Sequence, residues 1–222
     1  NTDHFHYFSG KIILDIPDID AYQQQNEDPG RLTSGRLKFR FQNGSGLISY
    51  DDVLLTKSQH MLTAFTVRNA WYASVNARWT VEKTGKNRLR LKGTWEGLPV
   101  TQYWDIELKD TVLIWKTSLE AAEKIVVGEY RAEMACHHSY TTWRQDQKRS
   151  SFPEGFDQQE KDLLSEPSRQ GLELMSAERG FSQVTARLLN EKNEHNYFLR
   201  LLNSDIYAKA RLFRAGFVAV DG

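Results

Sequence analysis

The sequence has few of the features that would assign it to a specialised class of protein. It contains a single cysteine, Cys136, in 222 residues, so no intramolecular disulfide can form. A lone cysteine without a recognisable signal peptide favours a reducing, cytoplasmic compartment. No stretch approaches the roughly 18 apolar residues of a membrane-spanning helix. We therefore expect neither a disulfide scaffold nor a helical membrane protein.

Charge of one sign and the common catalytic motifs are also missing. Lys and Arg total 29, as do Asp and Glu, so the formal net charge is zero and nothing indicates a nucleic-acid partner. There is no glycine-rich phosphate loop, no Gly-x-Ser-x-Gly elbow and no His-Glu-x-x-His. The run Cys136-His137-His138 lacks the second cysteine of a zinc knuckle. We expect no metal and no cofactor.

What the chain does contain is aromatic residues in alternating patterns. It has six Trp, nine Tyr and eleven Phe. Residues 102–108 place Trp104 and Ile106 on one face and charged residues on the other, which is typical of a strand. A two-residue turn at Lys109-Asp110 would set Trp104 opposite Trp115. Apolar residues also occur on the second face, which predicts a central strand covered on both sides.

Similar patterns recur along the chain. Residues 36–42 and 47–50 flank Asn43-Gly44, a strong hairpin signal. Further strands are expected over residues 4–8, 11–16, 60–67, 71–82, 87–92 and 124–136. Two more hairpins are expected, one joining 172–175 to 181–189 and the other joining 196–202 to 206–213. Many short strands with turn signals between them predict an all-β protein, an antiparallel β-sandwich formed by residues 1–222 as one domain.

Residues 145–180 interrupt this pattern. They are polar, with scattered Pro and Ser, and predict an irregular insertion. Asp157 and Glu160 form a capping-box pattern, which predicts one short helix over residues 157–164. Because the sequence begins at Asn1 rather than Met, we expect a domain taken from a longer protein.

A charged row lies in the strand expected over residues 124–136. Glu129, Arg131 and Glu133 alternate with apolar residues, so the two carboxylates lie on one face, with neighbours in the row about 7 Å apart. This row is either an ordinary solvated face or a polar groove that binds sugar hydroxyls. Four rings are available to stack on a pyranose or to fill the core: Trp71, Tyr72, Tyr140 and Trp143.

The run His138-Ser139-Tyr140-Thr141-Thr142-Trp143 resembles the His-Ser-Tyr-Phe-Asn-Leu motif of the galactose mutarotase (aldose 1-epimerase) family, and its first three positions match. The order of elements is also similar over residues 60–145. The resemblance implies a large supersandwich fold, with His138 as the general acid of sugar ring opening. The chain departs from the family in two places. The Asn-x-x-His-Gly region is matched only loosely, by Arg68-Asn69 and His60, and no late catalytic Glu matches, although mutarotation needs a base as well as an acid.

We therefore expect a non-catalytic carbohydrate-binding β-sandwich that is part of a larger glycan-handling protein. One alternative is an epimerase that uses His138. The other is a structural or protein-interaction domain, which would have a large exposed apolar patch. The residues expected to bind sugar are Arg68, Trp71, Glu129, Arg131, Glu133, His138, Tyr140 and Trp143.

Overall fold

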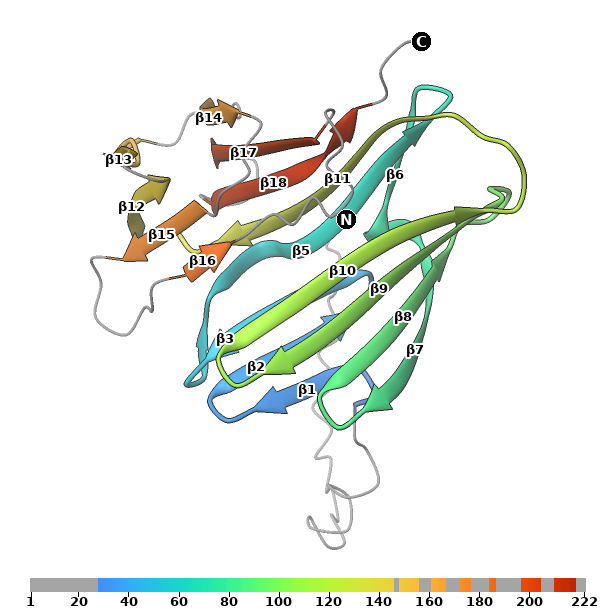
Figure 1. Ribbon diagram of the computed structural model, residues 1–222, viewed down its shortest axis with the longest axis horizontal. Helices are drawn as coiled ribbons and strands as arrows, with labels where there is room; N and C mark the ends of the chain where they lie inside the picture. Colours follow the sequence, from blue (N-terminus) through green and yellow to red (C-terminus); the bar gives the residue numbers. More distant parts are fainter. Residues whose placement is uncertain are drawn as a thin grey trace, which may run out of the picture.

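The computed structural model describes residues 28–145, 148–155, 161–166, 172–176, 184–186, 197–204 and 210–218. In these residues the chain forms antiparallel strands and one short 3-10 helix, with no α-helix. The strands make three sheets, which we call A, B and C (Figure 1). The expected all-β class and antiparallel sandwich are confirmed. The strands expected over residues 4–8 and 11–16 lie outside the described residues.

Sheet A is the largest, with the order β1-β2-β3-β5-β11-β18-β17-β14, β4 beside β3 and β6 beside β5. Its strands are β1 (Arg31–Ser34), β2 (Leu37–Gln42), β3 (Ser45–Tyr50), β4 (Val53–Leu54), β5 (Thr56–Val67), β6 (Ala70–Ala73), β11 (Val127–Cys136), β14 (Lys161–Glu166), β17 (Tyr197–Ser204) and β18 (Ala210–Val218). Sheet B has the order β10-β9-β8-β7: β7 (Arg78–Gly85), β8 (Arg88–Thr94), β9 (Val100–Lys109) and β10 (Val112–Ala121). Sheet C has the order β13-β12-β15-β16: β12 (Tyr140–Gln145), β13 (Lys148–Ser151), β15 (Leu172–Ser176) and β16 (Val184–Ala186).

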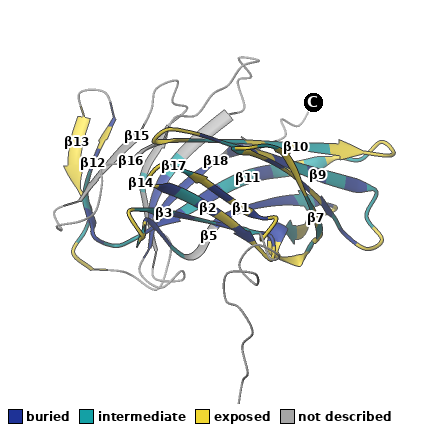
Figure 2. Cartoon of the chain, turned by 90° about the horizontal axis from the view of Figure 1, so that it is seen from below, coloured by how far each residue is buried: buried dark blue, intermediate teal, exposed yellow. Residues whose placement is uncertain are grey.

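Sheets A and B pack face to face over an aromatic core. Phe39 and Met61 of sheet A meet Leu91 and Trp104 of sheet B in one buried cluster, and a second cluster surrounds Phe65. Buried and exposed residues alternate along strands of both layers in Figure 2, whereas β13 is exposed throughout. Each large apolar side chain removed from water contributes about 1.5–3 kcal/mol, so the alternation by itself drives the two sheets together.

A chain of buried hydrogen bonds links the two sheets. Thr63 Oγ1 on β5 donates to Gln102 Oε1 on β9 at 2.8 Å and accepts from Trp104 Nε1 at 3.3 Å. Gln102 Nε2 donates to the Tyr130 hydroxyl at 3.1 Å. Thr63 and Gln102 are fully buried, and a buried polar group is costly unless it is hydrogen-bonded. These bonds therefore favour one alignment of the sheets over others.

The hairpin expected around Asn43-Gly44 is confirmed. β2 and β3 pair from Gln42 with Ser45 outwards, and Asn43 and Gly44 have φ values of +48° and +75°. Positive φ at both central residues is the conformation that favours Asn-Gly in two-residue hairpins. Gly44 is required for a second reason, since a side chain there would collide with the carbonyl of Ser74.

The β9–β10 hairpin forms, but with a different register from the one expected. Lys109 pairs with Val112, so the turn is Asp110-Thr111 and Trp104 pairs with Thr117. Asp110 takes a φ of +50°, which Asp tolerates better than most residues. The Trp104 and Trp115 rings still meet as diagonal neighbours, with centroids 5.0 Å apart. β10 is an edge strand with Val112 53% exposed, so the cover expected on both faces of this hairpin is incomplete.

The single strand expected over residues 71–82 is wrong. It is broken by a 3-10 helix, η1 (Ser74–Asn76), between β6 in sheet A and β7 in sheet B. Ser74 Oγ donates to the Gly44 carbonyl at 2.6 Å and accepts from Thr63 N at 3.1 Å. These contacts fix the position of the segment that crosses from sheet A to sheet B. Val75, in this segment, is 43% exposed rather than buried.

The interpretation of residues 145–180 also needs correction. Lys161 to Leu164, expected in a helix, lie in β14 and pair with β17, and β13 and β15 fall in the same region. Pairing within sheet A overrides the local capping signal, whose Asp157 and Glu160 lie outside the described residues. The later hairpin predictions are confirmed, because β15 pairs with β16 and β17 with β18.

Candidate functional site

The charged row predicted from the sequence lies on β11, in the middle of sheet A between β5 and β18. Tyr130 and Met134 of this strand pack into the core shared with sheet B. Since successive side chains of a strand point to opposite faces, Glu129, Arg131 and Glu133 share the outer face of sheet A.

Glu133 is the centre of this outer face and is not solvated. Its side chain is 2% exposed, with Oε1 lying 2.8 Å from Arg131 Nε and accepting a hydrogen bond from Arg214 Nε at 2.7 Å. A buried carboxylate is tolerated only when opposite charges surround it. Oε2 of Glu133 accepts no hydrogen bond within the described part of the chain. An ordinary solvated face is therefore the wrong interpretation for Glu133.

An aromatic ring lies beside these charges. Trp71 on β6 is 48% exposed, and the Arg131 guanidinium lies 4.2 Å from its ring centroid, within the range of a cation–π contact. The backbone N–H of Glu129 donates to Thr66 Oγ1 at 2.8 Å, and Thr66 is the cross-strand partner of Trp71. We call the following residues the Trp71 face: Trp71, Glu129, Arg131, Glu133 and Arg214. Arg68 is exposed in the turn that precedes β6.

The paired histidines lie at the end of β11, before β12. His138 Nδ1 is 3.0 Å from Lys57 Nζ, and His137 Nδ1 is 2.7 Å from Ser139 Oγ. The two imidazole centroids are 4.1 Å apart. Glu129 precedes the last residue of β11 by seven positions, which is about 23 Å along a strand. The structure therefore brings Glu129 together with Trp71 but does not bring it together with His138.

Tyr140 and Trp143 are 0% and 3% exposed, so neither offers a free ring face to a sugar, as the stacking role requires. The Tyr140 carbonyl accepts a hydrogen bond from Arg211 Nε at 3.1 Å. Burial, with a smaller Coulombic contribution from Cys136, raises the pKa of the Tyr140 hydroxyl above its ordinary value. Both residues have the environment of core aromatic residues.

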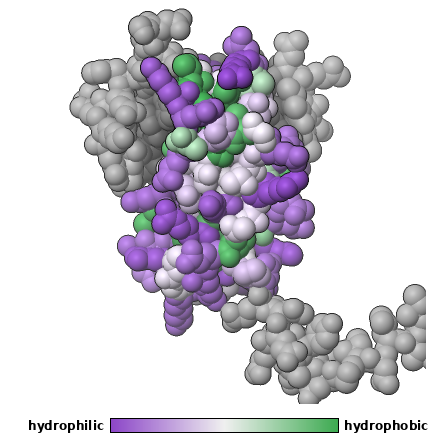
Figure 3. Space-filling view, turned by 90° about the vertical axis from the view of Figure 1, so that its right-hand side faces the viewer, coloured by the Kyte–Doolittle hydropathy of each residue, from purple (hydrophilic) through white to green (hydrophobic). Residues whose placement is uncertain are grey.

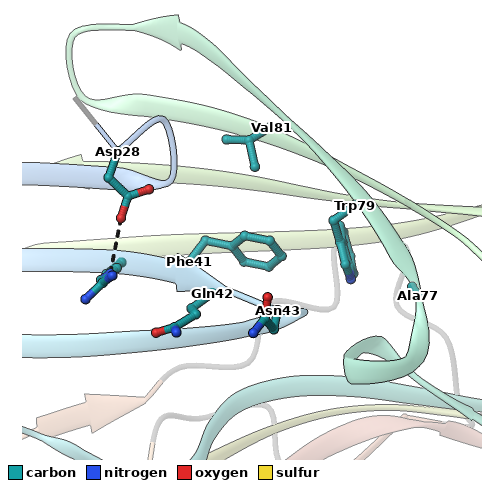
Figure 4. A pocket seen from close by; sticks show the side chains of 8 residues that line it. Asp28, Phe41, Gln42, Asn43, Ala77, Trp79 and Val81 are labelled. Atoms are coloured by element: carbon teal, nitrogen blue, oxygen red, sulfur yellow. Dashed lines mark hydrogen bonds and ion pairs between the residues drawn. The ribbon is translucent and has the colours of Figure 1, made fainter. Parts of the chain in front are cut away.

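A groove that the sequence did not indicate lies between β2 of sheet A and β7, at the edge of sheet B. Its volume is about 450 Å³. We call it the edge groove (Figure 4); it is lined by Asp28, Arg40, Phe41, Gln42, Asn43, Ala77, Trp79 and Val81. Its residues come from β2, β7 and neighbouring turns. Only the inward direction of Phe41 and Trp79 could be read from alternation, and both then appear as core.

The described residues contain no group of three His, Cys, Asp or Glu side chains that could hold a metal ion. They also contain no helix of the length and hydropathy needed to span a membrane.

No protein-family model matches this chain, and no curated protein matches it. It is similar to a solved structure described as a bacterial glucoamylase complexed with acarbose. The TM-score is 0.51 at 13% sequence identity, over 85% of this chain and 30% of the glucoamylase chain. Similarity at this identity shows a shared fold, the antiparallel β-sandwich, and does not establish the mutarotase-like family.

Proposed function

We propose that this protein binds carbohydrate through the Trp71 face and does not catalyse a reaction there. The observation that carries the proposal is the exposed Trp71 ring, held in place by Arg131 beside a buried carboxylate. An aromatic ring can stack on the C–H face of a pyranose, while carboxylates accept and guanidinium groups donate hydrogen bonds to its hydroxyls.

The ion pairs support binding by holding the site in one arrangement. Arg131 contacts both Glu133 and Trp71, and Glu133 is bonded in turn to Arg214. A side chain that is already ordered loses little conformational entropy when a ligand binds, whereas a free one costs about 0.5–1.5 kcal/mol. Glu129 and the exposed edge of Arg131 are then available to sugar hydroxyls.

The shared fold gives further, general support. The similar glucoamylase was solved with acarbose bound, but fold alone does not assign function. The match occupies 30% of that enzyme's chain, which supports a role for this fold as one part of a larger glycan-handling protein.

Two observations favour binding over the alternatives. Ring opening needs an acid and a base near one sugar, but His138 lies apart from Glu129, and Glu133 is buried in ion pairs with Arg131 and Arg214. A protein-interaction domain would have a broad apolar surface. The exposed large apolar residues described here come from separate elements, and Figure 3 shows small apolar groups among hydrophilic ones on the face it displays.

The test is a glycan array followed by calorimetry with the glycan that gives the strongest signal. Trp71→Ala should weaken binding about tenfold or more, which corresponds to about 1.4 kcal/mol. Val112→Ala is the matched control, since Val112 is also about half exposed, at 53%, but lies on sheet B. Absence of binding to every glycan, or equal affinity for both variants, would show that the proposal is wrong.

A further inference from the structure

The edge groove has a rigid aromatic wall. Trp79 is half-buried, and its ring centroid lies 5.2 Å from Phe41 and 5.2 Å from Trp104, with edge-to-face geometry in both pairs. The indole N–H donates to the Ser74 carbonyl at 2.7 Å, which sets the orientation of the ring. Across the ladder, a Cβ at Gly93 would lie 2.8 Å from the Trp79 ring, so this glycine is what allows the ring its position.

The rim of the edge groove along β2 is polar and electrically balanced, because exposed Arg40 and Gln42 alternate there with buried Phe41. Arg40 Nε donates to Asp28 Oδ2 at 3.1 Å, while Asp28 Oδ1 accepts from the Gly30 N–H at 3.1 Å. Gln42 and Asn43 add two exposed amides, each of which can donate and accept. Asp28 and Arg40 are the charged residues of the lining and are paired with each other. The chemistry therefore suits a neutral ligand with many hydroxyl groups.

The arrangement of these groups matters as much as their identity. Figure 4 shows Phe41 at the centre of the group, between Trp79 on the right and Asp28 on the left, with Val81 above and Gln42 and Asn43 below. Small-molecule sites combine aromatic walls with a few convergent polar groups in volumes of about 300–1,000 Å³, and the edge groove has this composition. A mere gap in the packing of the core would be lined by apolar atoms.

We propose that the edge groove is a binding site for a short neutral saccharide, distinct from the Trp71 face. The C–H face of a sugar ring packs against the half-buried Trp79, and its hydroxyls bond to Gln42, Asn43 and the Asp28–Arg40 pair. This inference goes beyond the proposed function because it needs no residue of the Trp71 face.

The experiment follows the indole N–H resonance of Trp79 by NMR during titration with maltose, cellobiose and lactose. The resonance is assigned by its loss in Trp79→Phe. A saturable shift is expected with at least one of the three sugars. The double variant Gln42→Ala/Asn43→Gly should weaken that binding about tenfold or more, a change of about 1.4 kcal/mol. Glycine at position 43 keeps the positive φ of the turn, so the hairpin should still form.

Two controls separate this inference from the proposed function. Thr80→Ala, an exposed change on the outer face of β7, and Trp71→Ala should both leave the Trp79 titration unchanged. The inference is overturned by the absence of a saturable shift with all three sugars, or by equal affinities in the double variant and Thr80→Ala. Sugar binding that is lost in Trp71→Ala but unaffected in the double variant would overturn the edge groove while leaving the proposed function intact.

Discussion

The outer faces of sheets A and B carry the same kind of sequence pattern and have opposite environments. On sheet B, Arg88 lies 2.8 Å from Glu107, with both side chains at least partly exposed, at 59% and 22%. On sheet A, Arg131 lies 2.8 Å from Glu133, which is 2% exposed. Both rows consist of charges at every second position of a strand. The distances are equal, so burial is what distinguishes the two faces.

This difference decides what each ion pair contributes. An exposed ion pair stabilises the fold only a little, because water and salt screen the attraction and two long side chains lose conformational entropy. A buried carboxylate depends on its guanidinium partners, since removing one side leaves a charge without compensation. We therefore regard the charged row on sheet B as a solvated surface. The charged row on sheet A is part of a site whose side chains are held in place by buried ion pairs.

The largest expected effect is on Glu133. Glu133→Gln removes the carboxylate charge that Arg131 and Arg214 share, and it should lower the free energy of unfolding by about 3–5 kcal/mol. Urea unfolding followed by tryptophan fluorescence measures this change. Glu107→Gln is the matched control on sheet B and should have a much smaller effect. If the two variants were equally stable, burial would not determine how much each ion pair contributes to stability.

A smaller effect sharpens the same comparison. Replacing both partners, in Glu133→Leu/Arg214→Met, removes the buried carboxylate together with one of its guanidinium partners. Such replacements are often neutral, so the double variant should be more stable than Glu133→Gln by about 1–3 kcal/mol. The same urea measurement gives the difference. A double variant less stable than Glu133→Gln would mean that these side chains hold sheet A together beyond their charge.

The smallest expected effect is a pH dependence on sheet B. The hydrogen bond from Arg88 lowers the pKa of Glu107 below its ordinary 4.5; desolvation opposes it as the second-largest effect, and the hydrogen bond from Lys109 adds a smaller lowering. A lowered folded-state pKa stabilises the protein above the unfolded pKa, and this contribution is lost as the pH falls through the folded value. The midpoint temperature of thermal unfolding should therefore fall slightly less steeply between pH 6 and pH 3 in Glu107→Gln than in the unmodified protein. An identical decline in both proteins would contradict the assignment.

The sequence predicted those parts of the fold that depend on residues adjacent in the chain, and it missed those that depend on contacts between distant residues. The hairpin around Asn43-Gly44 was predictable because its alternation and turn residues are adjacent in the chain. The β9–β10 hairpin was predicted with a displaced register, since neither candidate turn contains the glycine that would decide between them. The break at Ser74 was missed because alternation continues through Val75, and the contacts that cause it come from Gly44 and Thr63.

The candidate site was predictable to a similar extent. The alternation of Glu129, Arg131 and Glu133 follows from the sequence, and so does their common face. The buried ion pair of Glu133 depends on Arg214, which is 81 residues away, and Trp71 is exposed on β6, a short strand that lies beside β5 off the main path of sheet A. Tyr140 and Trp143 resemble stacking rings in sequence, yet both are buried.

By itself, the sequence determined which residues form most strands and toward which side their side chains point. These properties depend on a period of two and on turn residues, which act between neighbours in the chain. Only the tertiary structure decided which charged face is shielded from water and which aromatic rings remain accessible. It also formed the edge groove from Phe41 and Trp79, which lie on different sheets. Solvent exposure is a property of the packed molecule, because it depends on side chains that are distant in sequence.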